Sequence, residues 1–175
     1  MLRVECRSTE DKTSVAAVAP DRERRLQLRL AVATGQCEQP EYTFPEGSVI
    51  AIGRGAQPAD TAGRVRRNHI AFLEVRDGAS ETVARAHARL EFDVALHAYV
   101  LFNESSSNPT FIRRDGRNLR VAPRDPRGVR VQSGDELQLG RAVLRIAISN
   151  WDEEEKDRRN DVRLTDRGNN EHTEH

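Results

Sequence analysis

The chain has 175 residues, and its 28 Lys and Arg residues are balanced by 28 Asp and Glu residues, so the formal net charge at neutral pH is zero. Hydrophobic residues make up 37% of the chain, which suffices for one core, and an aromatic share of 5% argues against a second one. No apolar run approaches the roughly 20 residues of a membrane helix, and residues 1–6 lack the apolar stretch of a secretory signal. We therefore expect a cytoplasmic protein that does not insert into membranes.

The first 24 residues are polar and of mixed charge, without a clear hydrophobic period. We expect them to form a flexible N-terminal extension. Residues 150–175 include the acidic run Asp152-Glu-Glu-Glu155 and stay highly charged, which is typical of a disordered tail or a short helix. Residues 25–149 are the expected folded domain.

Within that domain the hydrophobic pattern has the period of β-strands. Between residues 26 and 32 every second residue is Leu or Val, which predicts a half-buried strand. Further short strands are predicted at residues 42–44, 49–52, 88–92, 99–102, 110–112, 119–121, 129–131, 136–139 and 143–148. Turn signals such as Asp115-Gly116 and Gly140 separate them, and residues 54–86 form the one long irregular segment. About 10–11 short, mostly antiparallel strands without a helical period predict an all-β sandwich or barrel.

No catalytic or metal-binding pattern is apparent in the sequence. The two cysteines, Cys6 and Cys37, are far apart and lack metal-ligand spacing, as do His69 and His97. His87 has no nucleophile and carboxylate at a recognisable spacing that would make it a general base. We therefore expect no enzyme, no metal and no cofactor.

Three polar clusters at the ends of predicted strands carry a resemblance to a known family. They are Ile52-Gly53-Arg54, Val83-Ala-Arg-Ala-His87 and Ser105-Ser-Ser-Asn-Pro-Thr-Phe111. Their order and spacing resemble the forkhead-associated (FHA) domain, a β-sandwich that binds phosphothreonine. Residues 133–140, Ser-Gly-Asp-Glu-Leu-Gln-Leu-Gly, are similar to the closing hairpin of that family. The resemblance covers about residues 25–149 and implies a two-sheet β-sandwich.

The resemblance also implies a phosphopeptide site at the loops of one end. Its phosphopeptide-binding residues would be Arg54, Arg85, Ser107 and Asn108. The arginines would hold phosphate oxygens, and the Asn108 amide would hydrogen-bond the peptide backbone. Auxiliary phosphate contacts could come from Arg66, Arg67 and Ser106, whereas Gly53 and His87 would be structural.

The chain departs from the family pattern at two positions of that site. Ala84 stands where the family usually has Ser, which removes a hydroxyl from the phosphate cradle. A charge-assisted hydrogen bond of this kind contributes about 1.5–3 kcal/mol. Pro109 stands where the family usually has Gly, and its φ is fixed near −65°, so a turn that needs positive φ there cannot form.

Two functions from different classes follow from these observations. The first is a phosphothreonine-binding signalling adaptor that acts downstream of Ser/Thr kinases, with a kinase or a kinase substrate as its partner. The alternative is a degenerate FHA-like module that mediates phosphate-independent protein–protein interaction, as Ala84 and Pro109 suggest. Seven arginines between residues 113 and 130 raise nucleic-acid binding as a third reading. The zero net charge and the lack of interleaved aromatic residues disfavour it.

Overall fold

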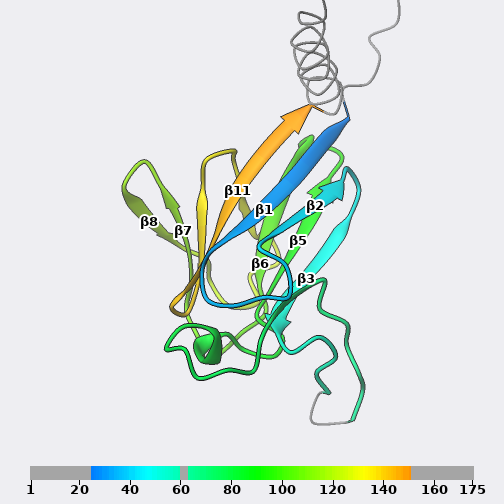
Figure 1. Cartoon of the computed structure of the whole chain (residues 1–175). Helices are drawn as coiled ribbons and strands as arrows, with labels where there is room; N and C mark the ends of the chain where they lie inside the picture. The colour runs from blue at the N-terminus through cyan, green and yellow to red at the C-terminus, as the bar shows by residue number, and fades with distance from the viewer. Residues whose placement is uncertain (1–24, 60–62, 151–175) are drawn as a thin grey trace, which may run out of the picture.

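The computed structural model describes residues 25–59 and 63–150, and these fold into eleven β-strands and one short 3₁₀ turn (Figure 1). The elements are β1 (Leu26–Thr34), β2 (Glu41–Pro45), β3 (Val49–Arg54), β4 (Ile70–Phe72), η1 (Ser80–Thr82), β5 (Ala88–Asp93), β6 (Ala98–Asn103), β7 (Thr110–Arg114), β8 (Arg117–Arg120), β9 (Val129–Arg130), β10 (Glu136–Leu139) and β11 (Ala142–Asn150). Among the described residues no helix is long and apolar enough to cross a membrane. The predicted N-terminal extension and, beyond Asn150, the C-terminal tail lie outside the described residues.

The strands form two sheets that pack face to face. One sheet has six strands in the order β2-β1-β11-β10-β7-β8, and the other has five in the order β4-β3-β5-β6-β9. All pairs of strands are antiparallel except β3 and β4, which run parallel. The prediction of an all-β, two-sheet sandwich of 10–11 mostly antiparallel strands is therefore confirmed.

Alternation of side chains along the strands explains how the core forms. In β1, Leu28 and Leu30 are fully buried while Arg29 between them is exposed. The opposing sheet contributes Ile52 and Leu90, also fully buried, so the two inner faces meet in one apolar layer. The six-stranded sheet is held together mainly by the long antiparallel pairing of β1 with β11.

The segment predicted to be irregular contains two regular elements, β4 and η1. The residues of β4, Ile-Ala-Phe, are all buried, so they show no polar alternation, and three residues are too few to reveal a strand by pattern. The strand forms because Ile70 and Phe72 fill the core beside the end of β3. The prediction of an unbroken irregular segment over residues 54–86 was wrong at these two places.

Three loops meet at one end of the sandwich, which we call the loop end. They are the β3–β4 loop (residues 55–59 and 63–69), the β4–β5 loop (residues 73–87) and the β6–β7 loop (residues 104–109). Figure 1 shows these loops at the bottom, whereas β1 begins and β11 ends at the top. The three sequence clusters that carry the family resemblance are all in or beside these loops.

Candidate functional site at the loop end

The end of β3 touches the backbone of the β4–β5 loop without a side chain between them. A Cβ on Gly53 would lie 2.1 Å from the carbonyl oxygen of Arg85, so only glycine fits at this position. The next residue, Arg54, donates its backbone N–H to the Ala84 carbonyl at 3.0 Å. Arg54, at the end of β3, and Arg85, in the β4–β5 loop, therefore lie on two backbone segments that are in direct contact.

Asn68 stabilises the contact between the end of β3 and the β4–β5 loop. Its buried side-chain Nδ2 donates to the Arg85 carbonyl at 2.9 Å and to the Gly55 carbonyl at 2.8 Å. One amide therefore ties the chain just after Arg54 to Arg85 itself. Sequence analysis did not identify Asn68. Nothing in the local sequence indicates that its amide donates to two backbone carbonyls.

The two arginines differ in how they are held. Arg54 is half-buried, and its Nη1 donates to the Glu81 carbonyl at 3.0 Å, while its buried Nε has no partner in the described part of the chain. Arg85 is exposed, and its guanidinium makes no hydrogen bond or ion pair with the described residues. Neither guanidinium contacts a carboxylate there. Because a guanidinium has five N–H donors, both retain donors for an anion.

His87 is fully buried and connects three elements beneath the site. Its N–H donates to the Ile52 carbonyl of β3 at 3.0 Å, and its Nδ1 accepts the Ala84 N–H at 2.9 Å. Its carbonyl accepts the N–H groups of Glu104 and Ser105 in the β6–β7 loop, at 2.9 and 3.1 Å. One residue therefore sets the relative positions of β3 and of two loops.

The ring of His87 is neutral at physiological pH. Burial lowers its pKa to about 4, and hydrogen bonding toward the Pro109 carbonyl offsets only part of that effect. Since Nδ1 accepts a hydrogen bond from Ala84, the single ring proton is on Nε2, which faces Pro109 without a well-formed hydrogen bond.

The β6–β7 loop presents Asn108 on a fixed backbone. The buried hydroxyl of Ser105 accepts the Asn108 N–H at 3.0 Å, and the Pro109 carbonyl accepts the Gly140 N–H at 2.9 Å. The Asn108 side chain is half-buried and makes no hydrogen bond within the described chain. Ser106 and Ser107 are exposed at the tip of the loop.

The two arginines expected to assist phosphate binding lie in the β3–β4 loop and differ in their contacts. Arg66 forms an ion pair with Glu104, and the structure would have to break this pair for Arg66 to reach a phosphate. Arg67 is exposed, and its guanidinium makes no hydrogen bond or ion pair with the described residues. The structure therefore brings Arg54, Arg85 and Asn108 to one end and holds Arg66 to a neighbouring acid.

Comparison with known proteins identifies the architecture. A family model described as the FHA domain matches residues 50–140, which is just over half of the chain. No significant match is found among curated proteins.

Solved structures show the same fold. The kinase-interacting FHA domain of the kinase-associated protein phosphatase KAPP from Arabidopsis is 18% identical, with a TM-score of 0.51, and the match covers 72% of this chain and 96% of that one. Full-length yeast Pml1p is 17% identical, with a TM-score of 0.50 and coverages of 75% and 87%. An FHA domain of a hypothetical protein from Arabidopsis thaliana is 24% identical over 71% of this chain and 85% of that chain, with a TM-score of 0.49.

Proposed function

The chain belongs to the FHA domain family, whose members are generally phosphothreonine-dependent protein-interaction modules, and we propose that it is an adaptor that binds phosphothreonine peptides at the loop end. Its partners would be proteins phosphorylated by a Ser/Thr kinase, the kinase itself included. We propose that this activity takes place in the cytoplasm.

The observation that carries the proposal is the pair of arginines without acidic partners. Arg54 and Arg85 flank one backbone contact, and neither guanidinium contacts a carboxylate among the described residues. A phosphate group carries a charge of about −1.5 to −2 and three strong acceptor oxygens. These suit two guanidinium groups on neighbouring backbone segments. The uncommitted amide of Asn108 would hold the peptide backbone beside them.

A second function is favoured by Ala84. Its carbonyl accepts the Arg54 N–H and it directly precedes Arg85, but its side chain offers no hydroxyl to a phosphate. The β6–β7 loop supplies the exposed hydroxyls of Ser106 and Ser107 as replacements. If these do not compensate, the domain would bind partners independently of phosphorylation.

Fluorescence anisotropy with a degenerate peptide library in phosphothreonine, phosphoserine and unmodified forms tests the proposal. We expect phosphothreonine-dependent binding near micromolar affinity, about −8 kcal/mol. Removing one arginine in Arg85→Ala or Arg54→Ala should weaken binding by roughly tenfold to a hundredfold. Arg85→Ala is the cleaner variant, because that guanidinium makes no contact within the described fold.

Arg117→Ala is the matched control, since Arg117 is exposed on β8 and its replacement changes the net charge equally. It should leave the affinity unchanged. Equal binding of phosphorylated and plain peptides by the folded protein would overturn the adaptor proposal and establish the phosphate-independent function.

A further inference from the structure

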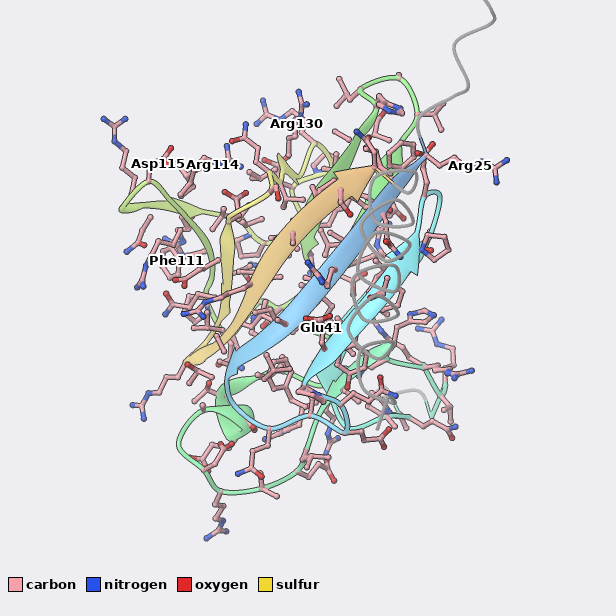
Figure 2. All side chains as sticks on the ribbon, turned by 45° about the horizontal axis from the view of Figure 1, so that its top comes forward. Arg25, Glu41, Phe111, Arg114, Asp115 and Arg130 are labelled. Atoms are coloured by element: carbon pink, nitrogen blue, oxygen red, sulfur yellow. The ribbon has the colours of Figure 1, made fainter. Side chains whose placement is uncertain are left out.

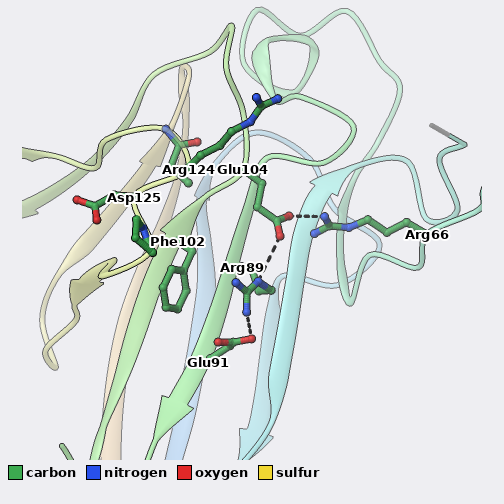
Figure 3. A pocket seen from close by; sticks show the side chains of 9 residues that line it. Arg66, Arg89, Glu91, Phe102, Glu104, Arg124 and Asp125 are labelled. Atoms are coloured by element: carbon green, nitrogen blue, oxygen red, sulfur yellow. Dashed lines mark hydrogen bonds and ion pairs between the residues drawn. The ribbon is translucent and has the colours of Figure 1, made fainter. Parts of the chain in front are cut away.

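A groove of about 530 Å³ lies beside the β6–β7 loop, on the outer face of the five-stranded sheet (Figure 3). Its lining includes three arginines and three acids, which are Arg66, Arg89, Arg124, Glu91, Glu104 and Asp125. Glu104 is the first residue of the β6–β7 loop, which also carries Asn108. The groove is therefore next to the proposed peptide site. None of its charged residues is part of the arginine pair proposed to hold the phosphate.

The acids of the groove are all engaged by arginines of the protein. Glu104 binds both Arg66 and Arg89, the latter at 3.2 Å between Nε and Oε1. Arg89 also pairs with Glu91, and its guanidinium stacks 4.6 Å from the centre of the Phe102 ring. Figure 3 shows these ion pairs as a connected chain across the groove.

The third acid, Asp125, is engaged outside this chain. It accepts the backbone N–H of Arg127 at 2.9 Å and its Nε at 3.3 Å. A basic side chain entering the groove would therefore find each carboxylate already occupied.

Arg124 is the exception among the arginines. It is exposed, and its guanidinium makes no hydrogen bond or ion pair with the rest of the described structure. Its φ of 56° places it in the left-handed region, which costs a residue with a Cβ roughly 1 kcal/mol or more. In Figure 3 its side chain extends past the strand end that carries Glu104, toward the loops drawn above it and away from the Arg89–Glu91 ion pair.

Asn103 attaches Arg124 to the proposed peptide-binding loop. The buried Asn103 accepts the Arg124 N–H at its carbonyl, at 2.9 Å, and its Nδ2 donates to the Val121 carbonyl at 3.1 Å. Its Oδ1 accepts the Ser105 N–H at 3.0 Å. The segment that carries Arg124 and the loop that carries Asn108 are therefore fixed by one side chain.

From this arrangement we propose that Arg124 binds an acidic side chain of the partner, so that the domain selects phosphothreonine motifs with an acidic residue near the phosphothreonine. The inference rests on the proposed function and names the class of peptide that the site prefers. Charge complementarity supports it, because the groove has an uncommitted guanidinium and no uncommitted carboxylate within the described residues. The open groove gives a flanking residue room to approach.

A scan of aspartate through the positions flanking phosphothreonine, in an otherwise alanine peptide, tests the inference. With the wild-type protein we expect at least one position at which Asp improves the affinity by roughly twofold to fivefold. The gain should disappear in Arg124→Gln and remain in Arg117→Gln, which removes an equal charge from β8. Arg124→Gly serves as a second variant, because glycine adopts the observed φ without strain.

The outcomes separate this inference from the proposed function. Phosphate-dependent binding without any preference for Asp, or with a preference that survives in both Arg124 variants, would overturn the acidic specificity alone. Loss of phosphate dependence in the wild-type protein would overturn both. Both Arg124 variants should retain the phosphate dependence and the effect of Arg85→Ala.

Discussion

The two loop-end arginines Arg54 and Arg85 differ in their electrostatic surroundings from the arginines near β7 and β10. Arg114 binds Asp135 through two nearly parallel hydrogen bonds, 2.8 Å from Nε and 2.7 Å from Nη2, and its pKa is raised by that carboxylate. Figure 2 shows Arg114 next to Asp115 at the end of β7, and Arg114 Nη2 also donates to the carbonyl of Arg130 in β9 at 2.9 Å. By contrast, the guanidinium groups of Arg54 and Arg85 contact no carboxylate among the described residues.

The difference shows that a basic stretch of sequence does not by itself mark a ligand site. Seven arginines lie between residues 113 and 130, yet three of them, Arg113, Arg114 and Arg127, form ion pairs within the fold. Arg113 and Arg145 share Glu136, at 3.3 and 3.2 Å. These ion pairs leave less free positive charge for nucleic acid than the sequence suggests.

The largest effect that we predict concerns the histidine that supports the loop end. In the unfolded chain His87 titrates near its ordinary pKa of 6.5, whereas in the folded protein its pKa is about 4. Between these values the unfolded state binds a proton that the folded state does not. The free energy of unfolding should therefore decrease by about 3 kcal/mol as the pH falls from 7 to 4, as urea denaturation would measure.

Two substitutions isolate this effect from the other histidines. His87→Asn keeps an acceptor close to the position of Nδ1 but cannot titrate, so the pH dependence between 4 and 6.5 should become much shallower. His97→Asn changes an exposed histidine at the opposite end of the sandwich, where φ is 44°, and should leave the dependence as in the wild type. A steep decrease that persists in His87→Asn would contradict the assignment.

A second prediction contrasts the two arginine environments directly. Arg114→Ala leaves the buried carboxylate of Asp135 with only the Gln132 N–H as a donor, and should lower the free energy of unfolding by about 2 kcal/mol. Its affinity for phosphothreonine peptides should not change. Arg85→Ala should show the reverse, with weaker binding and unchanged stability in parallel thermal melts and anisotropy titrations. A loss of affinity in Arg114→Ala would show that the two regions are coupled.

The sequence was a good guide to the fold because burial in a sandwich imposes a period of two. Leu28, Leu30, Ile50 and Ile52 alternate in the chain as they do between core and surface. The same reasoning missed β4, which is buried along its whole length and pairs in parallel with β3. Its formation depends on a neighbouring strand, and no local pattern contains that information.

At the site, sequence reasoning could name residues but not their contacts. The resemblance supplied Arg54, Arg85, Ser107 and Asn108, whose roles remain proposals. The bridging amides of Asn68 and Asn103 could not be foreseen, because their carbonyl partners come from other loops. Whether the Arg124 guanidinium has an acidic partner likewise depends on the fold. The nearby acids Glu104 and Asp125 bind other arginines.

A third prediction, with a smaller expected effect than the two above, concerns the hydroxyl that is missing at Ala84. Ala84 is fixed on both sides, since its N–H donates to His87 and its carbonyl accepts from Arg54, so a serine there should not move the backbone. The added hydroxyl would lie next to the backbone segments that carry the two arginines. It would give a phosphate oxygen one more hydrogen-bond donor. Ala84→Ser should raise the affinity for phosphothreonine peptides by roughly tenfold, or about 1.4 kcal/mol.

Unmodified peptides should gain nothing from this substitution, because the added hydroxyl acts on the phosphate. Ala95→Ser, in the exposed β5–β6 turn at the opposite end of the sandwich, is the matched control and should leave both affinities unchanged. Suppose that the wild-type protein binds both peptide forms equally and that Ala84→Ser confers phosphate dependence. The missing hydroxyl at position 84 would then explain why the wild-type domain binds independently of phosphate. If Ala84→Ser changes neither affinity, the phosphate does not lie between Arg54 and Arg85, and the arginine pair must serve another contact with the partner.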